Sequence, residues 1–220
     1  MSLPYIDVNP ESDVKAVVIW LHGLGDTGHG FAPIVPELRI PAELGVRFVF
    51  PHAPIQAVTI NNGMEMNAWY DIKSMDLAGR ADEAGVIDSA AKVAALIDDE
   101  IVKGTPSDKI VLAGFSQGGV IALHLSTRIG HKLAGVMALS TYMCTPEKLS
   151  AAKQAANLQT PFLMAHGRMD DVVPMFAGEQ AKQTLTDCGY NVQWHDYPMQ
   201  HNVCGEEVAE ISSWLQKVLA

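Results

Sequence analysis

The sequence predicts an α/β fold with a mostly parallel central sheet and helices on both faces. Short β-branched apolar runs alternate with longer helical patterns along the whole chain, which is the order that βαβ units produce. Most of these runs are almost continuously apolar, as strands covered on both faces are. No internal repeat, charge block or low-complexity linker interrupts the alternation. We therefore expect residues 1–220 to form a single domain.

Five short apolar runs are expected to form the centre of this sheet. They are Ala16 to Leu21, Val46 to Phe50, Ile110 to Ala113, Gly135 to Leu139 and Phe162 to Ala165. The segment Asn191 to Tyr197 differs, because apolar Val192 and Trp194 alternate there with polar neighbours. Alternation of this kind favours a less buried strand at the edge of the sheet.

Four segments between and after these runs have the periodicity of helices. Val86 to Ile101 repeats apolar residues at helical spacing, and Gly104 and Pro106 follow it as helix terminators. Gln117 to Ile129 is apolar over most of its first half and should be deeply buried, whereas Phe176 to Cys188 and Glu206 to Leu219 are amphipathic.

A different pattern occupies Gln56 to Asp71. Asn61-Asn62-Gly63 is a turn signal, and the apolar residues around it lack a clear period. We expect a structured loop or a short hairpin over the sheet.

Composition excludes several classes of protein. Of the 220 residues, 48% are hydrophobic and 18% are charged, and no stretch approaches the roughly 18 consecutive apolar residues of a membrane-spanning helix. The formal net charge of -10, without a compensating Lys/Arg cluster, argues against nucleic acid and anionic membranes as partners. The start of the chain, Met1 to Asp7, lacks the features of a secretory signal. We expect a cytoplasmic protein without stable membrane insertion.

The cysteines indicate neither a zinc site nor a disulfide framework. Cys144, Cys188 and Cys204 are widely spaced, odd in number and outside any C-x-x-C arrangement. We expect free thiols. A homodimer stays an open alternative, since no heptad repeat or other assembly signal is present.

Gly114-Phe115-Ser116-Gln117-Gly118 matches the pattern G-x-S-x-G. By chance this pattern occurs in roughly 7% of chains of this length. The neighbouring secondary structure therefore decides whether the match indicates a nucleophile. The predicted strand from Ile110 runs directly into it and a buried helix leaves it, as in the nucleophile elbow of α/β hydrolases. Such a strained turn needs glycines where Cβ atoms would collide. We interpret Ser116 as a nucleophile; the alternative is a glycine-rich turn with an incidental serine.

The glycine-spaced loop Leu21 to Gly28 follows the first strong strand. Acyl transfer places negative charge on the carbonyl oxygen, which fixed backbone N–H groups stabilise. In this fold the donors come from the residue after the nucleophile, here Gln117, and from an early loop, here at Leu24. The loop matches neither the P-loop nor the G-x-G-x-x-G pattern, so a nucleotide site is not expected. His22 is interpreted as a strand-end histidine without a catalytic role.

A serine nucleophile needs a histidine base, and in this fold the chain order is serine, acid, histidine. Of the histidines after Ser116, His131 and His166 come too early for that order, and His195 lies inside the alternating strand. His201 follows that strand in a loop, where open sheets of this type carry catalytic residues. We therefore prefer His201 to His195.

The acid is expected in the loop after the strand that precedes this histidine. Asp170 and Asp171 are adjacent there, and consecutive side chains cannot both face one imidazole. Spacing alone does not decide which of the two aspartates is the acid. We prefer Asp170, with Asp171 as the alternative and Glu147 as a third choice. The acid would hold His201 in the required tautomer and stabilise the imidazolium.

Four motifs occur in order along the chain. They are His22-Gly23-Leu24-Gly25-Asp26-Thr27-Gly28, Gly114-Phe115-Ser116-Gln117-Gly118-Gly119, His166-Gly167-x-x-Asp170-x-Val172-Val173-Pro174 and Tyr197-Pro198-Met199-x-His201. Together with Pro51-His52-Ala53-Pro54 and Trp69-Tyr70-Asp71, they resemble the acyl-protein thioesterase and bacterial carboxylesterase family, also called the phospholipase/carboxylesterase family.

The resemblance implies a compact α/β-hydrolase fold without a large lid domain and without a cofactor. It implies a triad at Ser116, Asp170 and His201 and oxyanion donors at Leu24 and Gln117. It thereby favours the first of the two adjacent aspartates. Many hydrolases of the wider fold carry glycine before the histidine, and this chain departs from them there with a glutamine.

The expected reaction is the hydrolysis of a carboxylic ester through an acyl-enzyme, on a small-molecule or lipid-like ester or thioester. Acyl-protein thioesterase and lysophospholipase share the same residues and stay alternatives. An inactive hydrolase scaffold that acts as a binding module is the alternative from another class, and the intact set of catalytic residues argues against it. Met64, Trp69, Met143 and Met169, with Met66 and Met199, are interpreted as the lining of an apolar acyl groove; the alternative is that they are simply core residues.

Overall fold

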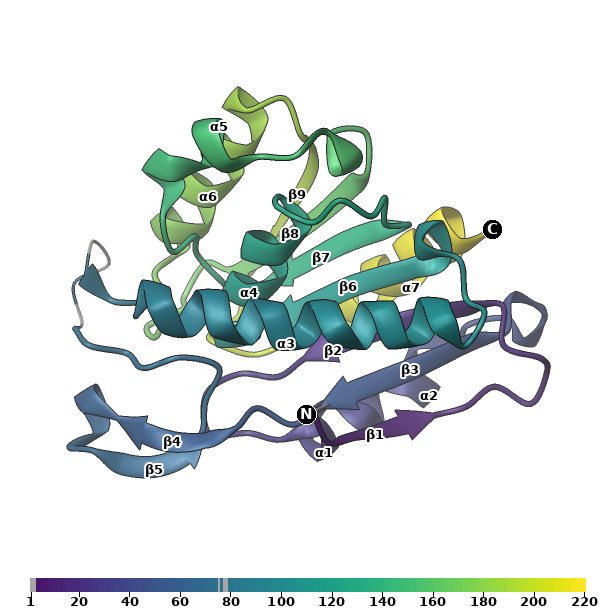
Figure 1. Cartoon of the computed structure of the whole chain (residues 1–220), viewed down its shortest axis with the longest axis horizontal. Coiled ribbons are helices and arrows are strands. Elements are labelled where there is room, and N and C mark those ends of the chain that lie inside the picture. Colours follow the sequence, from purple (N-terminus) through teal and green to yellow (C-terminus); the bar gives the residue numbers. More distant parts are fainter. Residues whose placement is uncertain (1–2, 75, 77–78) are drawn as a thin grey trace.

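A seven-stranded sheet organises the chain in the computed structural model, which describes residues 3–74, 76 and 79–220 (Figure 1). Its strands are β1 (Tyr5–Val8), β2 (Ala16–Leu21), β3 (Val46–Pro51), β6 (Ile110–Phe115), β7 (Gly135–Leu139), β8 (Pro161–Gly167) and β9 (Asn191–Tyr197). Their order is β1-β3-β2-β6-β7-β8-β9. β1 pairs antiparallel with β3, and the other neighbouring pairs are parallel. The predicted fold class is confirmed, and β9 lies at the expected edge.

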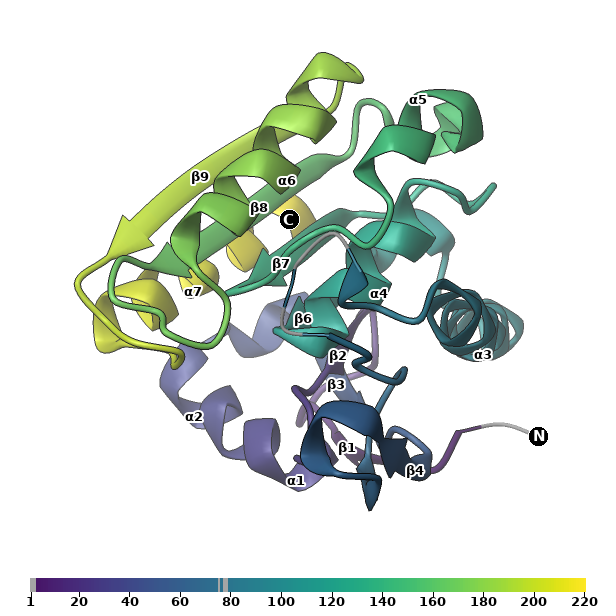
Figure 2. The same ribbon diagram turned by 90° about the vertical axis from the view of Figure 1, so that its left-hand side faces the viewer.

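Helices cover both faces of this sheet. The helices are α1 (Gly28–Phe31), α2 (Val35–Leu38), α3 (Glu83–Val102), α4 (Gln117–Ser126), α5 (Leu149–Ala152), α6 (Met175–Asp187) and α7 (Gly205–Leu219). Figure 2 looks onto the carboxyl ends of the parallel strands, with α3 and α4 on one side of the sheet and α1, α2 and α7 on the other. The four long helices were predicted from periodicity.

Burial on both faces explains the continuous apolar runs. In β2, Val17, Ile19 and Leu21 belong to the core cluster that contains residues of α3, α4 and α6. The residues between them, Val18 and Trp20, belong to a second cluster with residues of α7. Each side chain of this strand therefore meets apolar neighbours, whichever face it points to.

Some elements carry no clear signal in the sequence. The edge strand β1 spans only four residues and is half-buried. Its pairing partner β3 is far away in the chain, so local sequence does not reveal it. Helices α1 and α2 are single turns, and the Phe31 ring at the end of α1 stacks on Trp20 at 5.4 Å between centroids. Packing on the sheet, rather than helix propensity, explains these two helices.

The segment from Gln56 to Asp71 contains a hairpin of β4 (Ile55–Val58) and β5 (Met64–Asn67). Asn62 and Gly63 have φ of 55° and 75° at its turn, in agreement with the turn signal. The hairpin lies at the side of the molecule where the parallel strands end (Figure 1). The short-hairpin interpretation is therefore confirmed.

The cysteines and the amino terminus bear on two further expectations. Cys144, Cys188 and Cys204 are free thiols, each half-buried. Met1 and Ser2, which belong to the start of the chain used above to expect a cytoplasmic location, lie outside the described residues. Within the described ranges, no helix is both long and apolar enough to cross a bilayer.

A buried carboxyl group lies in the first turn of α7. Glu207 is 1% exposed, and a contact with the Cys204 backbone lowers its pKa by less than burial raises it. Burial raises the pKa of Glu207 to about 8, because the charged form loses its hydration. The side chain is therefore mostly neutral at pH 7.

We expect Glu207→Gln to stabilise the fold more at pH 8.5 than at pH 5. Between the ordinary value of 4.5 and the folded-state value of about 8, the folded chain binds more protons at this site than the unfolded chain. Its stability is then lost as pH rises, by up to about 1.4 kcal/mol per pH unit. Urea unfolding of both proteins at the two pH values measures the difference.

Glu206→Gln is the matched control, since the neighbouring Glu206 is exposed and its pKa is lowered from 4.5. Its stability difference from the wild type should be the same at pH 5 and 8.5. An equal difference at both pH values for Glu207→Gln would show that this carboxyl is ionised in the fold.

Candidate active site

A sharp turn joins β6 to α4 and carries Ser116. This residue has φ 53° and ψ -118°, a strained conformation for a residue with a side chain. Its N–H donates to the carbonyl of Leu139 at 2.9 Å, and its own carbonyl accepts from Thr141 Oγ1 at 2.7 Å. Hydrogen bonds to the end of β7 and to the residues just after it thus fix both the N–H and the carbonyl of Ser116.

Close backbone contacts explain the glycines around this serine. A Cβ on Gly114 would lie 2.3 Å from the carbonyl oxygen of Gly118, and a Cβ on Gly118 would lie 2.4 Å from that of Leu21. A Cβ on Gly119 would lie 2.6 Å from Thr141 Cβ. These distances are shorter than van der Waals contact, so the motif is a packing requirement of the turn.

Three side chains from different loops form one hydrogen-bonded chain. His201 Nε2 lies 2.9 Å from Ser116 Oγ, and its Nδ1 lies 2.7 Å from Asp170 Oδ2. The loops follow β6, β8 and β9, whose carboxyl ends share the edge shown in Figure 2. Phe115 packs against the imidazole with 4.8 Å between ring centroids. The arrangement allows the imidazole to accept the serine proton while the carboxylate binds its other nitrogen.

The other candidate residues lie outside this chain. His195 Nε2 contacts Gln193 at 2.8 Å and lies 3.5 Å from Glu210. Asp171 is exposed and Glu147 is exposed, and both line a cavity rather than contact His201. The structure therefore brings together the preferred histidine and the preferred aspartate.

Asp170 is surrounded by donors. Its Oδ1 accepts the N–H groups of Val172 and Val173 at 2.9 and 2.8 Å, and its Oδ2 accepts from His201. Burial alone raises the pKa of Asp170, but hydrogen bonds from His166, His201 and the Val173 backbone outweigh burial and hold the pKa well below its ordinary value. The carboxylate is therefore ionised at neutral pH.

His166 is a neighbour of the acid that sequence reasoning missed. It was set aside as a base because it precedes the acid, yet its Nε2 lies 3.4 Å from Asp170 Oδ2 and 2.8 Å from the carbonyl of Val173. It is 1% exposed. The signal available in the sequence was its position four residues before the aspartate.

Backbone contacts align the loops that carry the acid and the histidine. The N–H of Arg168 donates to Tyr197 O at 2.8 Å, and that of Met169 donates to Met199 O at 3.0 Å. A Cβ on Gly167 would lie 2.4 Å from the carbonyl oxygens of Met199 and Gln200. The two loops pack so closely that glycine is required at the end of β8.

The two candidate oxyanion donors lie beside the serine. Gln117 is the first residue of α4, where N–H groups lack helical acceptors, and the loop at Leu24 passes close by. A Cβ on the preceding Gly23 would lie 3.5 Å from Ser116 Cβ. Among the described residues, no acceptor binds the N–H of Leu24 or of Gln117. Both N–H groups therefore lack a protein acceptor within the part of the chain that the structure describes.

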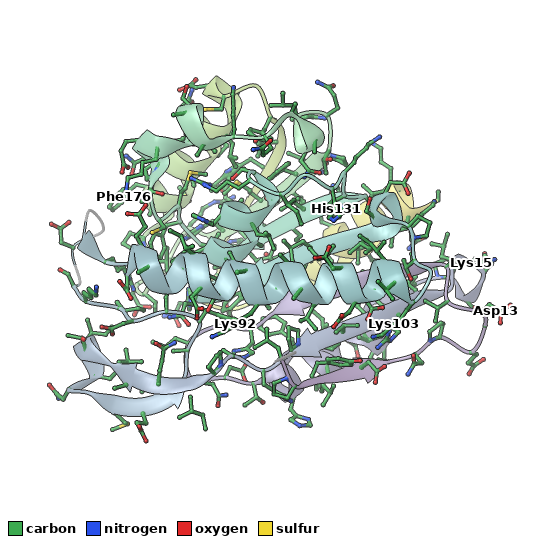
Figure 3. The ribbon with its side chains drawn as sticks, in the orientation of Figure 1. Asp13, Lys15, Lys92, Lys103, His131 and Phe176 are labelled. Atoms are coloured by element: carbon green, nitrogen blue, oxygen red, sulfur yellow. The ribbon has the colours of Figure 1, made fainter. Side chains whose placement is uncertain are left out.

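A cavity of about 780 Å³ lies between the segment after β7 and the start of α6. Arg80, Tyr142, Met143, Val172 and Phe176 are among its lining residues. Figure 3 labels Phe176 on the side of the molecule where the parallel strands end, and this ring is 59% exposed. The cavity therefore lies near the end of the sheet that carries the hydrogen-bonded chain.

The predicted acyl-groove residues are not gathered in this cavity. Met143 lines it, whereas Trp69 is 1% exposed and packs against the His22 ring in the core. Met64 and Met169 are 64% and 56% exposed, and neither lines the cavity. Met66 and Met199 do not line it either, and Met199 is buried. Chemical type alone grouped these residues, and the fold separates them.

Comparisons with known proteins show what the chain is similar to. Residues 6–219 match the family described as Phospholipase/Carboxylesterase. The chain is 43% identical over 213 residues to acyl-protein thioesterase 1 of Neurospora crassa, covering 93% of this chain and 87% of that protein. It is 35% identical to acyl-protein thioesterase 1 of Yarrowia lipolytica, with coverage of 97% and 96%. The crystal structure of Zea mays acyl-protein thioesterase 2 superposes with a TM-score of 0.89 at 28% identity, covering 99% of each chain.

We expect Gly118→Ala to destabilise the fold by about 1–3 kcal/mol, because the new Cβ would collide with the backbone of Leu21 and His22. Gly130→Ala is the control, since nothing lies within 4 Å of a Cβ at Gly130. Urea unfolding measures both. If Gly118→Ala and Gly130→Ala had the same free energy of unfolding, the turn would accommodate a Cβ at Gly118 and the steric explanation would be wrong.

Proposed function

Because the chain belongs to the phospholipase/carboxylesterase family of serine hydrolases, we propose that it hydrolyses acyl thioesters with Ser116, His201 and Asp170 as catalytic triad. The observation that carries this proposal is the hydrogen-bonded chain from Ser116 Oγ through the imidazole to Asp170. The N–H groups of Leu24 and Gln117, which bind no acceptor among the described residues, support it, since a tetrahedral intermediate needs such donors.

The proposed reaction proceeds through an acyl-enzyme. Ser116 Oγ attacks the thioester carbonyl carbon, and its proton passes to His201 Nε2. The carbonyl oxygen becomes an oxyanion, which accepts hydrogen bonds from the backbone of Leu24 and Gln117. The carbon–sulfur bond breaks, the imidazolium returns its proton to the departing thiolate, and the acyl group stays on the serine. Water then attacks with the imidazole as base, and the carboxylic acid and free Ser116 are released.

The electrostatics of Asp170 suit this role. A carboxylate that accepts two backbone N–H groups and binds His201 Nδ1 stays ionised throughout the reaction. It keeps the imidazole in the tautomer that leaves Nε2 free to accept the serine proton. It also stabilises the positive charge that the imidazole acquires.

The choice of thioester over carboxylic ester rests on the relatives. The residues by themselves favour a carboxylic ester, whereas the similar proteins from Neurospora crassa and Yarrowia lipolytica are named acyl-protein thioesterases. The same catalytic groups serve both reactions, because both pass through an oxyanion. Carboxylesterase is therefore the second candidate, supported by the description of the family.

The cavity beside Met143 and Val172 is proposed to receive the acyl group. Its volume of about 780 Å³ falls within the usual range of about 300–1,000 Å³ for ligand pockets. A single domain, a cytoplasmic location and a homodimer stay predictions.

We expect Ser116→Ala to abolish turnover and fluorophosphonate labelling while the circular dichroism spectrum and melting temperature stay near those of the wild type. The physical reason is that the attacking oxygen is lost and the backbone is kept. Turnover that persists in this variant would contradict the assignment of the nucleophile.

A second measurement addresses the substrate. We expect a higher kcat/KM for an acyl thioester than for the oxygen ester of the same acyl chain, compared over short and long chains. A preference for the oxygen ester across the series would favour carboxylesterase instead.

We expect Asp170→Asn to lower kcat by up to about 10⁴-fold, because the amide no longer stabilises the imidazolium or fixes its tautomer. Asp171→Asn is the matched control at the adjacent exposed position, and it should retain kcat. Steady-state kinetics on one substrate compare the two variants with the wild type. The reverse ranking would move the acid to Asp171.

A further inference from the structure

The proposed oxyanion donors come from parts of the chain that are distant in sequence. Leu24 lies in the loop after β2, and Gln117 begins α4 after β6. An oxyanion hole stabilises the transition state only if both N–H groups are fixed before the reaction begins. Something must therefore hold the loop and the helix start in one relative position.

We propose that the segment Asn67 to Tyr70, which leaves the hairpin, positions both oxyanion donors, and that Trp69 and the Gln117 side chain are positioning residues for the hydrolysis. This inference rests on the proposed function, because it assigns support to the same oxyanion site. It gives the segment a role beyond core packing.

On the Leu24 side, two hydrogen bonds hold the loop. The N–H of Gly25 donates to the carbonyl of Asn67 at 2.8 Å. The indole N–H of Trp69 donates to the carbonyl of His22 at 2.9 Å. These contacts lie on either side of the peptide that contains the Leu24 N–H, so they restrict its position from both directions.

On the other side, the Gln117 side chain binds the same segment. Its Oε1 accepts the N–H of Trp69 at 2.8 Å, and its Nε2 donates to the carbonyl of Tyr70 at 2.7 Å. Gln117 is 2% exposed, so water does not compete for these bonds. The residue that offers its backbone N–H to the oxyanion is thus held through its side-chain amide.

The segment is itself anchored. The N–H of Ala68 donates to Pro54 O at 3.0 Å, and Asn67 Nδ2 donates to Ala53 O at 2.7 Å. Ser89 Oγ donates to the carbonyl of Trp69. Trp69 is 1% exposed. A buried segment with its polar groups paired moves little, which is what a positioning element requires.

His22 closes the network. Its Nε2 accepts the N–H of Ala53 at 3.0 Å, so its Nδ1 carries the proton and donates to Gly23 O at 2.7 Å. Burial lowers the pKa of His22 and keeps the imidazole neutral, as this pair of bonds requires. The hairpin exit, the loop after β2 and α4 are therefore joined in one hydrogen-bonded unit.

Two variants test the inference without removing either backbone donor. Gln117→Met keeps the approximate size of the side chain and deletes both amide hydrogen bonds. Trp69→Phe deletes the indole N–H. For each we expect kcat to fall by about 10- to 100-fold, somewhat less than the loss caused by removing a whole donor, while KM changes by less than about 3-fold.

A transition-state analogue separates positioning from structural support. An alkyl trifluoromethyl ketone forms a tetrahedral adduct with the serine and places its oxyanion in the hole. Its inhibition constant should rise in proportion to the loss of kcat in both variants. Ser89→Ala, which loosens the segment without altering either donor residue, should show a smaller effect of the same kind and keeps the test available if Gln117→Met does not fold.

Thr160→Val is the control for lost stability. Thr160 is buried, and its hydroxyl donates to Leu133 O at 3.2 Å. It precedes β8 and so lies at the amino ends of the parallel strands, away from the candidate site at their carboxyl ends. The Thr160→Val substitution should lower the melting temperature and leave kcat and the inhibition constant unchanged.

Two results would overturn the inference. One is a wild-type kcat per folded molecule in the Trp69 and Gln117 variants. The other is a loss expressed in KM, with the inhibition constant following KM, which would make Trp69 a ground-state binding residue. Failure of the proposed function looks different, because the wild type itself would then show no turnover and no labelling of Ser116.

Discussion

The contact between the start of α4 and the end of β2 is the constraint on which the site depends. Gly118 lies so close to the backbone of Leu21 and His22 that no Cβ fits between them. This approach forces the chain to turn within one residue, and Ser116 takes the strained conformation. It also brings the loop that follows β2 against the serine. One backbone contact therefore fixes the position of Ser116 and of the loop that contains Leu24 together.

The order of strands distributes the remaining groups around this contact. β6 lies between β2 and β7, and β8 and β9 follow toward the edge. Because these strands are parallel, the loops after them meet at one end of the sheet. The loops that carry Asp170 and His201 are then joined by backbone hydrogen bonds from Arg168 and Met169. The imidazole reaches the serine because its loop is held against the loop of its acid.

Burial has opposite electrostatic consequences at two carboxyl groups. Asp170 is surrounded by N–H donors, and these hold its pKa below the ordinary value despite burial. Glu207 lies in α7, where the Cys204 backbone offsets burial only in part, and burial raises its pKa to about 8. Burial penalises the charged form of both carboxyl groups, and the hydrogen bonds that Asp170 accepts outweigh this penalty at that residue. The charged group lies in the candidate site, and the neutral one lies in the first turn of α7.

The sequence by itself determined the fold class, the four long helices, the edge position of β9 and the candidates Ser116, Asp170 and His201. These features depend on local patterns: apolar periodicity, a glycine-spaced turn and the order of residues along parallel strands. Tertiary structure alone decided the pairing of β1, the helical turns near Phe31, the contact of His166 with the acid and the place of Trp69. β1 and Trp69 meet partners that are distant in the chain, whereas His166 meets an acid only four residues away because of the conformation of the loop after β8. Apolar character alone suggested one groove for the methionines and Trp69, whereas packing buried Trp69 against His22 and left Met64 and Met169 exposed.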